Sequence, residues 1–319
     1  KIAQSALKTF RPSLVMFDES LLDIPSEMRK VLGCVADELP EAKVLWSLPD
    51  TLGDPQYVMR HWATNGVLEA FDYAHEIFIY GAESVFDYAS AYEMPEPLSR
   101  KLRYTGYLTR QMIPPQRVRV DVGRMNRNKQ PLVVLTAGGE SGDFALVDAY
   151  LRFLEKAEDL TVQSLLFIGP AIGAREKRLL LARAQRLRNV VLHRVDKHML
   201  HYLKFADLSI STGSYNVMCE VLAHRKPALV VPNHKEQPGN YHRAKLLQQR
   251  GLITLCAPEE FHPEFLREQF DKTLFGGPRL VQKAQYEAIP QNGYTTIVER
   301  TRLQAGRAQH AAATLALAS

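Results

Sequence analysis

Two short stretches of small and polar residues have the composition of phosphate-binding turns. Residues 211–216 read S-T-G-S-Y-N and follow the apolar segment 206–210, while residues 138–143 read G-G-E-S-G-D and follow the apolar run 132–137. Where such a turn leads from a strand into a helix, the first helical N–H groups have no partner within the helix and can bind an anion. Carboxyl ends of parallel strands meet at one edge of a sheet, so we expect both turns to open on one crevice and bracket a diphosphate.

The glycine-rich stretch differs from the loop of a nucleoside triphosphatase. Gly138, Gly139 and Gly142 carry no Cβ and therefore let a ligand approach the backbone closely. No G-K-[ST] follows them, and no lysine is positioned to reach a terminal phosphate, which disfavours ATP hydrolysis. Taken alone, the stretch could equally be a tight connection between strand and helix. Its interpretation as a phosphate site depends on the second turn, at residues 212–214.

Glu220 is a single acid among apolar residues in the segment that should form a helix after the second turn. Its neighbours Val217, Met218, Val221 and Leu222 would pack on a sheet. A carboxylate at this point could accept hydrogen bonds from two ribose hydroxyls. The alternative is a solvated helix residue without a role in binding. We favour the ribose ligand, because an acid near a buried face is rare.

Other polar residues at the ends of expected strands could contact substrate. Glu236 and Gln237 lie in the loop after the strand that ends at Pro232, and their side chains could hydrogen-bond a sugar's hydroxyls unless the loop is simply solvated. Asp18 follows the apolar segment L-V-M-F and is the first candidate for a general base, with Glu19 second. The alternative for both acids is a cap or a turn.

The sequence contains neither of two common metal-binding patterns. No D-x-D motif occurs, and no H-E-x-x-H accompanies the nearby residues His193, His198 and His201, which we expect to be structural or exposed. We therefore expect no metal and no cofactor. Helix N-termini and glycine turns would stabilise a leaving diphosphate through their fixed dipoles.

Strands and helices alternate along both halves of the chain. Apolar strands are expected at 13–17, 43–48, 76–80 and 103–108, then from 131, at 164–170, 189–195, 206–210 and 226–232, with helices between them including 55–74, 143–156 and 174–188. Such alternation is typical of a parallel, doubly wound sheet. The fold class is therefore α/β, with two Rossmann-like domains.

The domain boundaries follow from this alternation. We expect a partial amino-terminal domain at 1–108, a basic linker at 109–130, a nucleotide-sugar-binding domain at 131–290, and a terminal helix and tail at 291–319. The first series of strands is short for a doubly wound domain. We therefore expect the amino-terminal domain to be truncated.

Composition narrows the function classes. The chain has 319 residues, of which 46% are hydrophobic, and a formal charge of +5 that is too small to indicate a nucleic-acid partner. No apolar run approaches the ~20 residues that span a bilayer, and no signal peptide opens the chain. Cys34, Cys219 and Cys256 are widely separated, which argues against a disulfide framework and favours the cytoplasm.

These motifs together resemble the two-Rossmann (GT-B) glycosyltransferases. The chain particularly resembles the carboxyl-terminal domain of the N-acetylglucosaminyltransferases that form lipid II, and it is closer still to an uncharacterised bacterial group of predicted glycosyltransferases. It spans residues 12–300 and is most specific at 195–250. The matching features are G-G-E-S-G-D, G-S-Y-N-x-x-C-E at 213–220, K-P-A-L-V-V-P at 226–232, E-Q at 236–237, S-L-P-D-T-L-G-D-P at 47–55 and R-Y-T-G-Y-L at 103–108.

The resemblance implies a nucleotide-sugar donor of the UDP type, and with no D-x-D motif we expect an inverting, metal-independent transfer of the sugar. Val195 would lie by the base, Gly213 and Ser214 would hold phosphate, Glu220 would hold ribose, and Glu236 with Gln237 would hold the donor sugar. The full expected substrate-binding set is Gly138, Gly139, Glu140, Ser141, Val195, Thr212, Gly213, Ser214, Tyr215, Asn216, Glu220, Glu236 and Gln237. Asp18, chosen for its position after L-V-M-F, is the expected catalytic base.

The acceptor side departs from the family's pattern. A glycine-rich G-H-x-x-R loop opens these enzymes, and nothing in residues 1–20 matches it. The acceptor is left open between a lipid-linked molecule, which would bring peripheral membrane contact, and a polysaccharide. Two other functions fit the residues: a nucleotide-sugar 2-epimerase, and a non-catalytic nucleotide-sugar-binding or assembly protein.

Overall fold

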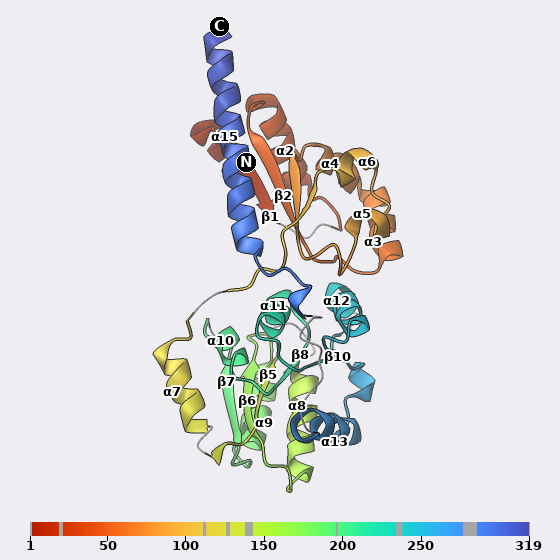
Figure 1. Cartoon of the computed structure of the whole chain (residues 1–319), viewed down its shortest axis with the longest axis vertical. Helices are drawn as coiled ribbons and strands as arrows, with labels where there is room; N and C mark the ends of the chain where they lie inside the picture. The colour runs from red at the N-terminus through yellow and green to blue at the C-terminus, as the bar shows by residue number, and fades with distance from the viewer. Residues whose placement is uncertain are drawn as a thin grey trace. The chain divides into compact units, whose positions relative to one another are not determined.

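The computed structural model divides into two compact units, which are described separately. Unit 1 comprises residues 1–108 and 289–319, and unit 2 comprises residues 109–288 (Figure 1). The described residues are 2–18, 22–110, 113–125, 128–137, 143–195, 197–233, 238–276 and 286–318, without the side chains of 143 and 307–318.

Unit 1 is built on a four-stranded parallel sheet in the order β1-β2-β3-β4. The strands are β1 (Leu14–Asp18), β2 (Lys43–Pro49), β3 (Glu76–Tyr80) and β4 (Leu102–Tyr104). The helices are α1 (Ile2–Phe10), α2 (Ser26–Glu38), α3 (Pro55–Asn65), α4 (Val67–Asp72), α5 (Tyr88–Ala91), α6 (Glu96–Ser99) and α15 (Gly293–Ala318). The central strands β2 and β3 are buried, as expected for a sheet covered on both faces.

The helix expected at 55–74 is interrupted. Asp54 caps α3 by accepting hydrogen bonds from two backbone N–H groups, and Pro55 occupies the first helical position, as the sequence predicted. Gly66 then adopts a left-handed conformation with φ of 57°, and α4 starts after it. A single helix cannot continue through this backbone geometry, so the expectation of one helix was wrong.

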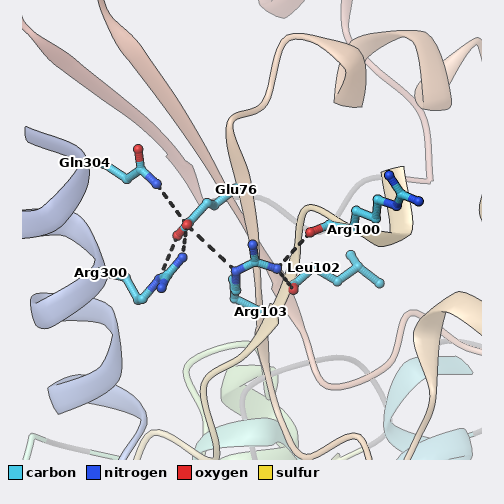
Figure 2. A network of polar contacts seen from close by, with 6 residues as sticks. All are labelled: Glu76, Arg100, Leu102, Arg103, Arg300 and Gln304. Atoms are coloured by element: carbon cyan, nitrogen blue, oxygen red, sulfur yellow. Dashed lines mark hydrogen bonds and ion pairs between the residues drawn. The ribbon is translucent and has the colours of Figure 1, made fainter. Parts of the chain in front are cut away.

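The terminal helix α15 lies along the sheet of unit 1, beside β1 and β2 (Figure 1). Figure 2 shows how it is attached through the buried carboxylate of Glu76 at the start of β3. Arg300 donates to this carboxylate from Nε at 3.0 Å and from Nη2, and Gln304 donates from Nε2 at 2.8 Å. Arg103 lies 3.8 Å away on β4. The terminal helix expected within 291–319 therefore forms and packs in unit 1.

Unit 2 contains a six-stranded parallel sheet in the order β10-β9-β8-β5-β6-β7. Its strands are β5 (Leu132–Thr136), β6 (Gln163–Ile168), β7 (Val190–Arg194), β8 (Leu208–Ser211), β9 (Ala228–Val230) and β10 (Thr254–Leu255). Its helices are α7 (Gln116–Met125), α8 (Asp143–Lys156), α9 (Ala174–Ala184), α10 (Met199–Leu203), α11 (Tyr215–Ala223), α12 (Pro238–Gln249), η2 (Pro258–Glu260), α13 (Pro263–Phe270) and the π-helical η3 (Asp271–Phe275). The two parallel sheets confirm the predicted α/β class.

The stretch 109–130, expected as a linker, contains α7 within unit 2. Val118 and Val122 on this helix are buried, and the Tyr202 hydroxyl donates to Asp121 at 2.9 Å. The helix has low intrinsic propensity, because valines and a glycine occupy its turns, and packing stabilises it instead. Among the helices of the described residues, none has both the length and the apolar character needed to cross a membrane.

A candidate donor site at the carboxyl edge of the unit 2 sheet

Strands β5 and β8 form the point at which the strand order of unit 2 reverses. From β5 the chain proceeds through β6 to β7 on one side, and then returns to place β8 on the other side of β5. Thr136 at the end of β5 pairs in register with Ser211 at the end of β8. Open α/β sheets bind ligands in the crevice at such a switch point. The strands that precede residues 138–143 and 212–214 in the sequence are therefore neighbours.

The second turn connects β8 to α11 through Thr212, Gly213 and Ser214. Thr212 is buried, and the N–H of Gly213 donates to the Ser211 hydroxyl at 3.2 Å. Ser214 is the N-cap residue of α11, yet its side chain makes no capping hydrogen bond. A nine-residue helix thus begins at the switch point with its positive dipole end at the carboxyl edge of the sheet.

Gly213 is constrained by the fold itself. Its φ is 78°, and a Cβ built there would lie 2.7 Å from Cγ1 of Val230 on β9. Both the backbone conformation and the neighbouring strand therefore exclude a larger residue. A Gly213→Val change would therefore do more than obstruct a ligand, because the added side chain would collide with β9.

Arg243 on α12 is a buried cation beside this turn that sequence reasoning missed. It donates to the carbonyl of Gly213 at 3.2 Å and to Oδ1 of Asn240 at 2.8 Å. Its guanidinium carbon lies 5.4 Å from the ring centre of Tyr215, a cation–π distance. Only 3% of Arg243 is exposed. Local sequence did not predict this burial, because Arg243 stands in a polar stretch. Asn216, which follows Tyr215 in the expected substrate-binding set, is exposed.

Glu220 lies two turns along α11 and is 5% exposed, which contradicts the alternative of a solvated helix residue. Its Oε2 is 3.4 Å from Nε2 of His224, one turn further on. Both side chains line a small cavity of about 10 Å³ together with Arg110, Pro114, Lys197, Leu200, His201 and Lys204. Three of these residues are exposed cations, so the buried carboxylate lies in basic surroundings.

His201 faces the same cavity from α10. Burial lowers the pKa of its imidazole below the usual range, and the positive charges of His198 and Arg110 lower it further, although Glu220 acts in the opposite direction. His201 is therefore neutral near pH 7. A search of the described residues finds no group of three or more His, Cys, Asp or Glu side chains that could hold a metal ion.

The remaining donor-side residues are divided between described and undescribed parts of the chain. Val195 follows β7 and is half-buried, with its N–H donating to the Ile168 carbonyl at 3.0 Å. The sheet order separates it from β5 by β6. The following expected residues lie outside the described ranges: Gly138, Gly139, Glu140, Ser141, Gly142, Glu236 and Gln237.

Among the described residues of unit 1, Asp18 and Asp50 lie at the carboxyl ends of strands. Asp18 ends β1 with an exposed side chain and accepts a hydrogen bond from the Tyr80 hydroxyl at 3.1 Å. Burial raises the pKa of Tyr80 to about 12, so this hydroxyl stays protonated as a donor. Asp50, which sequence reasoning did not single out, is buried after β2 and accepts from the Tyr107 hydroxyl at 3.2 Å. The alternative base, Glu19, lies outside the described residues.

Two Rossmann-like units, the second with a helix N-terminus at its switch point, define the GT-B architecture. The family model of the glycosyltransferase family 28 C-terminal domain matches residues 133–300, which is more than half of the chain. The chain therefore belongs to this glycosyltransferase family. The match covers all of β5 but its first residue, β8, α11 and the cavity-lining residues from 197 to 224.

Solved structures with the same fold include both transferases and epimerases. MurG from Acinetobacter baumannii is 16% identical with a TM-score of 0.57, over 93% of this chain and 76% of that one. The glycosyltransferase SnogD from Streptomyces nogalater is also 16% identical, with a TM-score of 0.57 over 94% and 75%. A UDP-GlcNAc 2-epimerase from Neisseria meningitidis, bound to UDP-GlcNAc, is 13% identical with a TM-score of 0.58 over 94% and 78%. A search of curated protein sequences found no match.

Proposed function

We propose that this glycosyltransferase uses a UDP-sugar donor, bound by unit 2, and transfers the sugar with inversion and without a metal ion. The observation that carries the donor assignment is that α11 starts at the switch point and bears the buried acid Glu220 on the same helix. A helix N-terminus favours a diphosphate, and a carboxylate accepts from ribose hydroxyls.

The spacing along α11 suits a nucleoside diphosphate. Ser214 and Glu220 are six residues apart, which corresponds to about 9 Å along a helix axis. The diphosphate would lie at the turn 212–214, and the ribose would lie beside Glu220. The free cavity is about 10 Å³, so the ribose would enter by displacing the exposed side chains of Lys197 and Lys204.

Positive charge near the turn would stabilise the leaving diphosphate. Arg243 is held within hydrogen-bond distance of the Gly213 carbonyl, and its position is fixed by Asn240 and Tyr215. Fixed dipoles and charges of this kind need no reorganisation when negative charge develops on the leaving group. This arrangement supports the metal-independent proposal. Donor-sugar contacts are assigned to Glu236 and Gln237.

The acceptor step is assigned to Asp18 in unit 1. The acceptor hydroxyl would attack the anomeric carbon while the bond from that carbon to the diphosphate breaks, and its proton would pass to the Asp18 carboxylate. A single displacement of this kind inverts the anomeric configuration. Tyr80 would hold the carboxylate through its 3.1 Å hydrogen bond. The acceptor class stays open between lipid-linked molecules, with peripheral contact at a membrane, and polysaccharides.

A 2-epimerase is the second candidate, supported by the shared fold with a UDP-GlcNAc 2-epimerase. Incubating the protein with UDP-GlcNAc and other UDP-sugars, with and without lipid-linked and polysaccharide acceptors, separates the possibilities. Acceptor-dependent UDP release supports transfer, while a 2-epimer formed without UDP release supports epimerisation. Calorimetric UDP binding with neither product would support the binding-protein alternative, and no binding of UDP would refute the donor assignment.

A further inference from the structure

We infer that His224 is a positioning residue that holds the Glu220 carboxylate in the orientation needed to bind the two hydroxyls of a ribose. This inference rests on the proposed function, since it assumes that unit 2 binds a ribonucleotide. It adds a residue from outside the expected set, found only through its contact with Glu220 in the cavity.

The contact joins two residues one helical turn apart. His224 is the C-cap residue of α11, and its N–H donates to the Glu220 carbonyl at 2.9 Å. The last turn of the helix therefore carries both side chains on one face. Nε2 of His224 is 3.4 Å from Oε2 of Glu220, and both residues line the cavity. The other carboxylate oxygen, Oε1, is the one that this pair leaves for a ligand.

Cations that line the cavity could compete with His224 for the Glu220 carboxylate. Arg110, Lys197 and Lys204 line the same space and have exposed, long side chains that can approach a buried anion. Without His224, Glu220 would turn toward one of these cations, because an unpaired buried charge is unfavourable. A carboxylate already bound to lysine or arginine accepts hydrogen bonds from ribose less well. The imidazole therefore maintains the geometry for recognition of the diol.

The expected signature is the preference for ribose over deoxyribose. Glu220 held by His224 should accept from both ribose hydroxyls, so the protein should bind UDP about tenfold more tightly than 2′-deoxy-UDP. His224→Phe keeps a ring of similar size but has no donor, and should lower this ratio to about two. His224→Gln keeps a side-chain donor within reach of the carboxylate and should restore most of the ratio.

Calorimetric titration of the full chain with UDP and with 2′-deoxy-UDP measures this ratio, and a melting curve of each variant reports folding. The matched control is Glu264→Gln on α13, where an exposed carboxylate lies 3.0 Å from Nδ1 of His262 and does not line the cavity. This variant should keep the ratio of the unaltered protein. If His224 only stabilised the fold, its variants would have a lower melting temperature and an unchanged affinity ratio.

The outcomes separate the inference from the function on which it rests. Loss of the ratio in His224→Phe with recovery in His224→Gln supports the inference. An unchanged ratio in a folded His224→Phe variant overturns it while leaving the donor proposal intact. A chain that binds neither nucleotide overturns both. If His224→Phe fails to fold, the test rests on His224→Gln alone. An affinity ratio as low as two in a folded His224→Gln variant would contradict the inference that a side-chain donor at position 224 holds the Glu220 carboxylate.

Discussion

Replacing Glu76 by glutamine should loosen the terminal helix from unit 1. The carboxylate is 3% exposed and accepts hydrogen bonds from Arg300 and Gln304, while Arg103 lies 3.8 Å away. Glutamine has a similar shape but carries no charge, and its amide nitrogen would face these donors. The change therefore removes the negative charge and one of the two acceptor oxygens that join α15 to β3.

The expected loss follows from burial. Removing one partner of a fully buried ion pair typically costs about 3–5 kcal/mol, because the other charge remains buried. The Arg300 and Arg103 side chains are 31% and 40% exposed, so water can partly solvate both guanidinium groups. Gln304 is only 4% exposed and would share the one remaining acceptor oxygen with Arg300. We therefore expect unit 1 to lose about 2–3 kcal/mol, a large share of the usual stability of a domain.

Differential scanning calorimetry measures this loss, and UDP titration shows whether unit 2 is affected. We expect a melting transition lowered by several degrees with unchanged UDP affinity. Glu96→Gln is the matched control, because Glu96 and Arg100 form an exposed pair in the same unit, worth at most about 1 kcal/mol. Equal stability of the Glu76 variant and the unaltered protein, or an equal loss in the Glu96 control, would refute the reasoning.

Four further predictions test other parts of the structure. Gly213→Val should lower the melting temperature of unit 2 strongly, since its Cβ meets Val230, and a variant that melts normally would contradict this. UDP should raise the melting temperature equally with magnesium or with a chelator, and loss of the effect on chelation would refute metal-free binding. A fragment of residues 109–288 should melt higher than one of 131–288, because α7 buries Val118 and Val122; equal melting would argue against that packing. Burial raises the pKa of Cys256 to about 12, so the folded protein keeps this thiol protonated. The unfolded thiol ionises near pH 9, and the free energy of unfolding should therefore fall as pH rises from 9 toward 12. Rapid alkylation of Cys256 at pH 8 in the folded protein would contradict this.

Local patterns were sufficient for most elements. Short apolar runs bounded by turn residues predicted the strands, because a strand buried on both faces must be apolar throughout. The cap at Asp54 and the proline after it predicted the start of α3. Gly66 gave no comparable signal, since a glycine inside a helical pattern is compatible with either a tolerated residue or a left-handed break.

Contacts between distant segments were outside the reach of local patterns. Helix α7 forms in a basic stretch of low helical propensity because its two valines are buried and Tyr202 bonds to Asp121. The packing of α15 in unit 1 depends on Glu76, which is more than two hundred residues away in the sequence. Neither arrangement can be deduced from neighbouring residues, because the partner is set by the tertiary fold.

By itself, the sequence determined the α/β class, the two series of strands and the turn before α11, since these depend on hydrophobic periodicity and on glycine and hydroxyl residues close together in the chain. The tertiary structure decided that β5 and β8 are neighbours and that Gly213 faces Val230. It also decided that Arg243 is buried beside the turn, and that three separate segments line the Glu220 cavity. The physical reason is that burial and charge environment depend on which side chains the folded chain brings together, and one sequence position does not specify its distant neighbours.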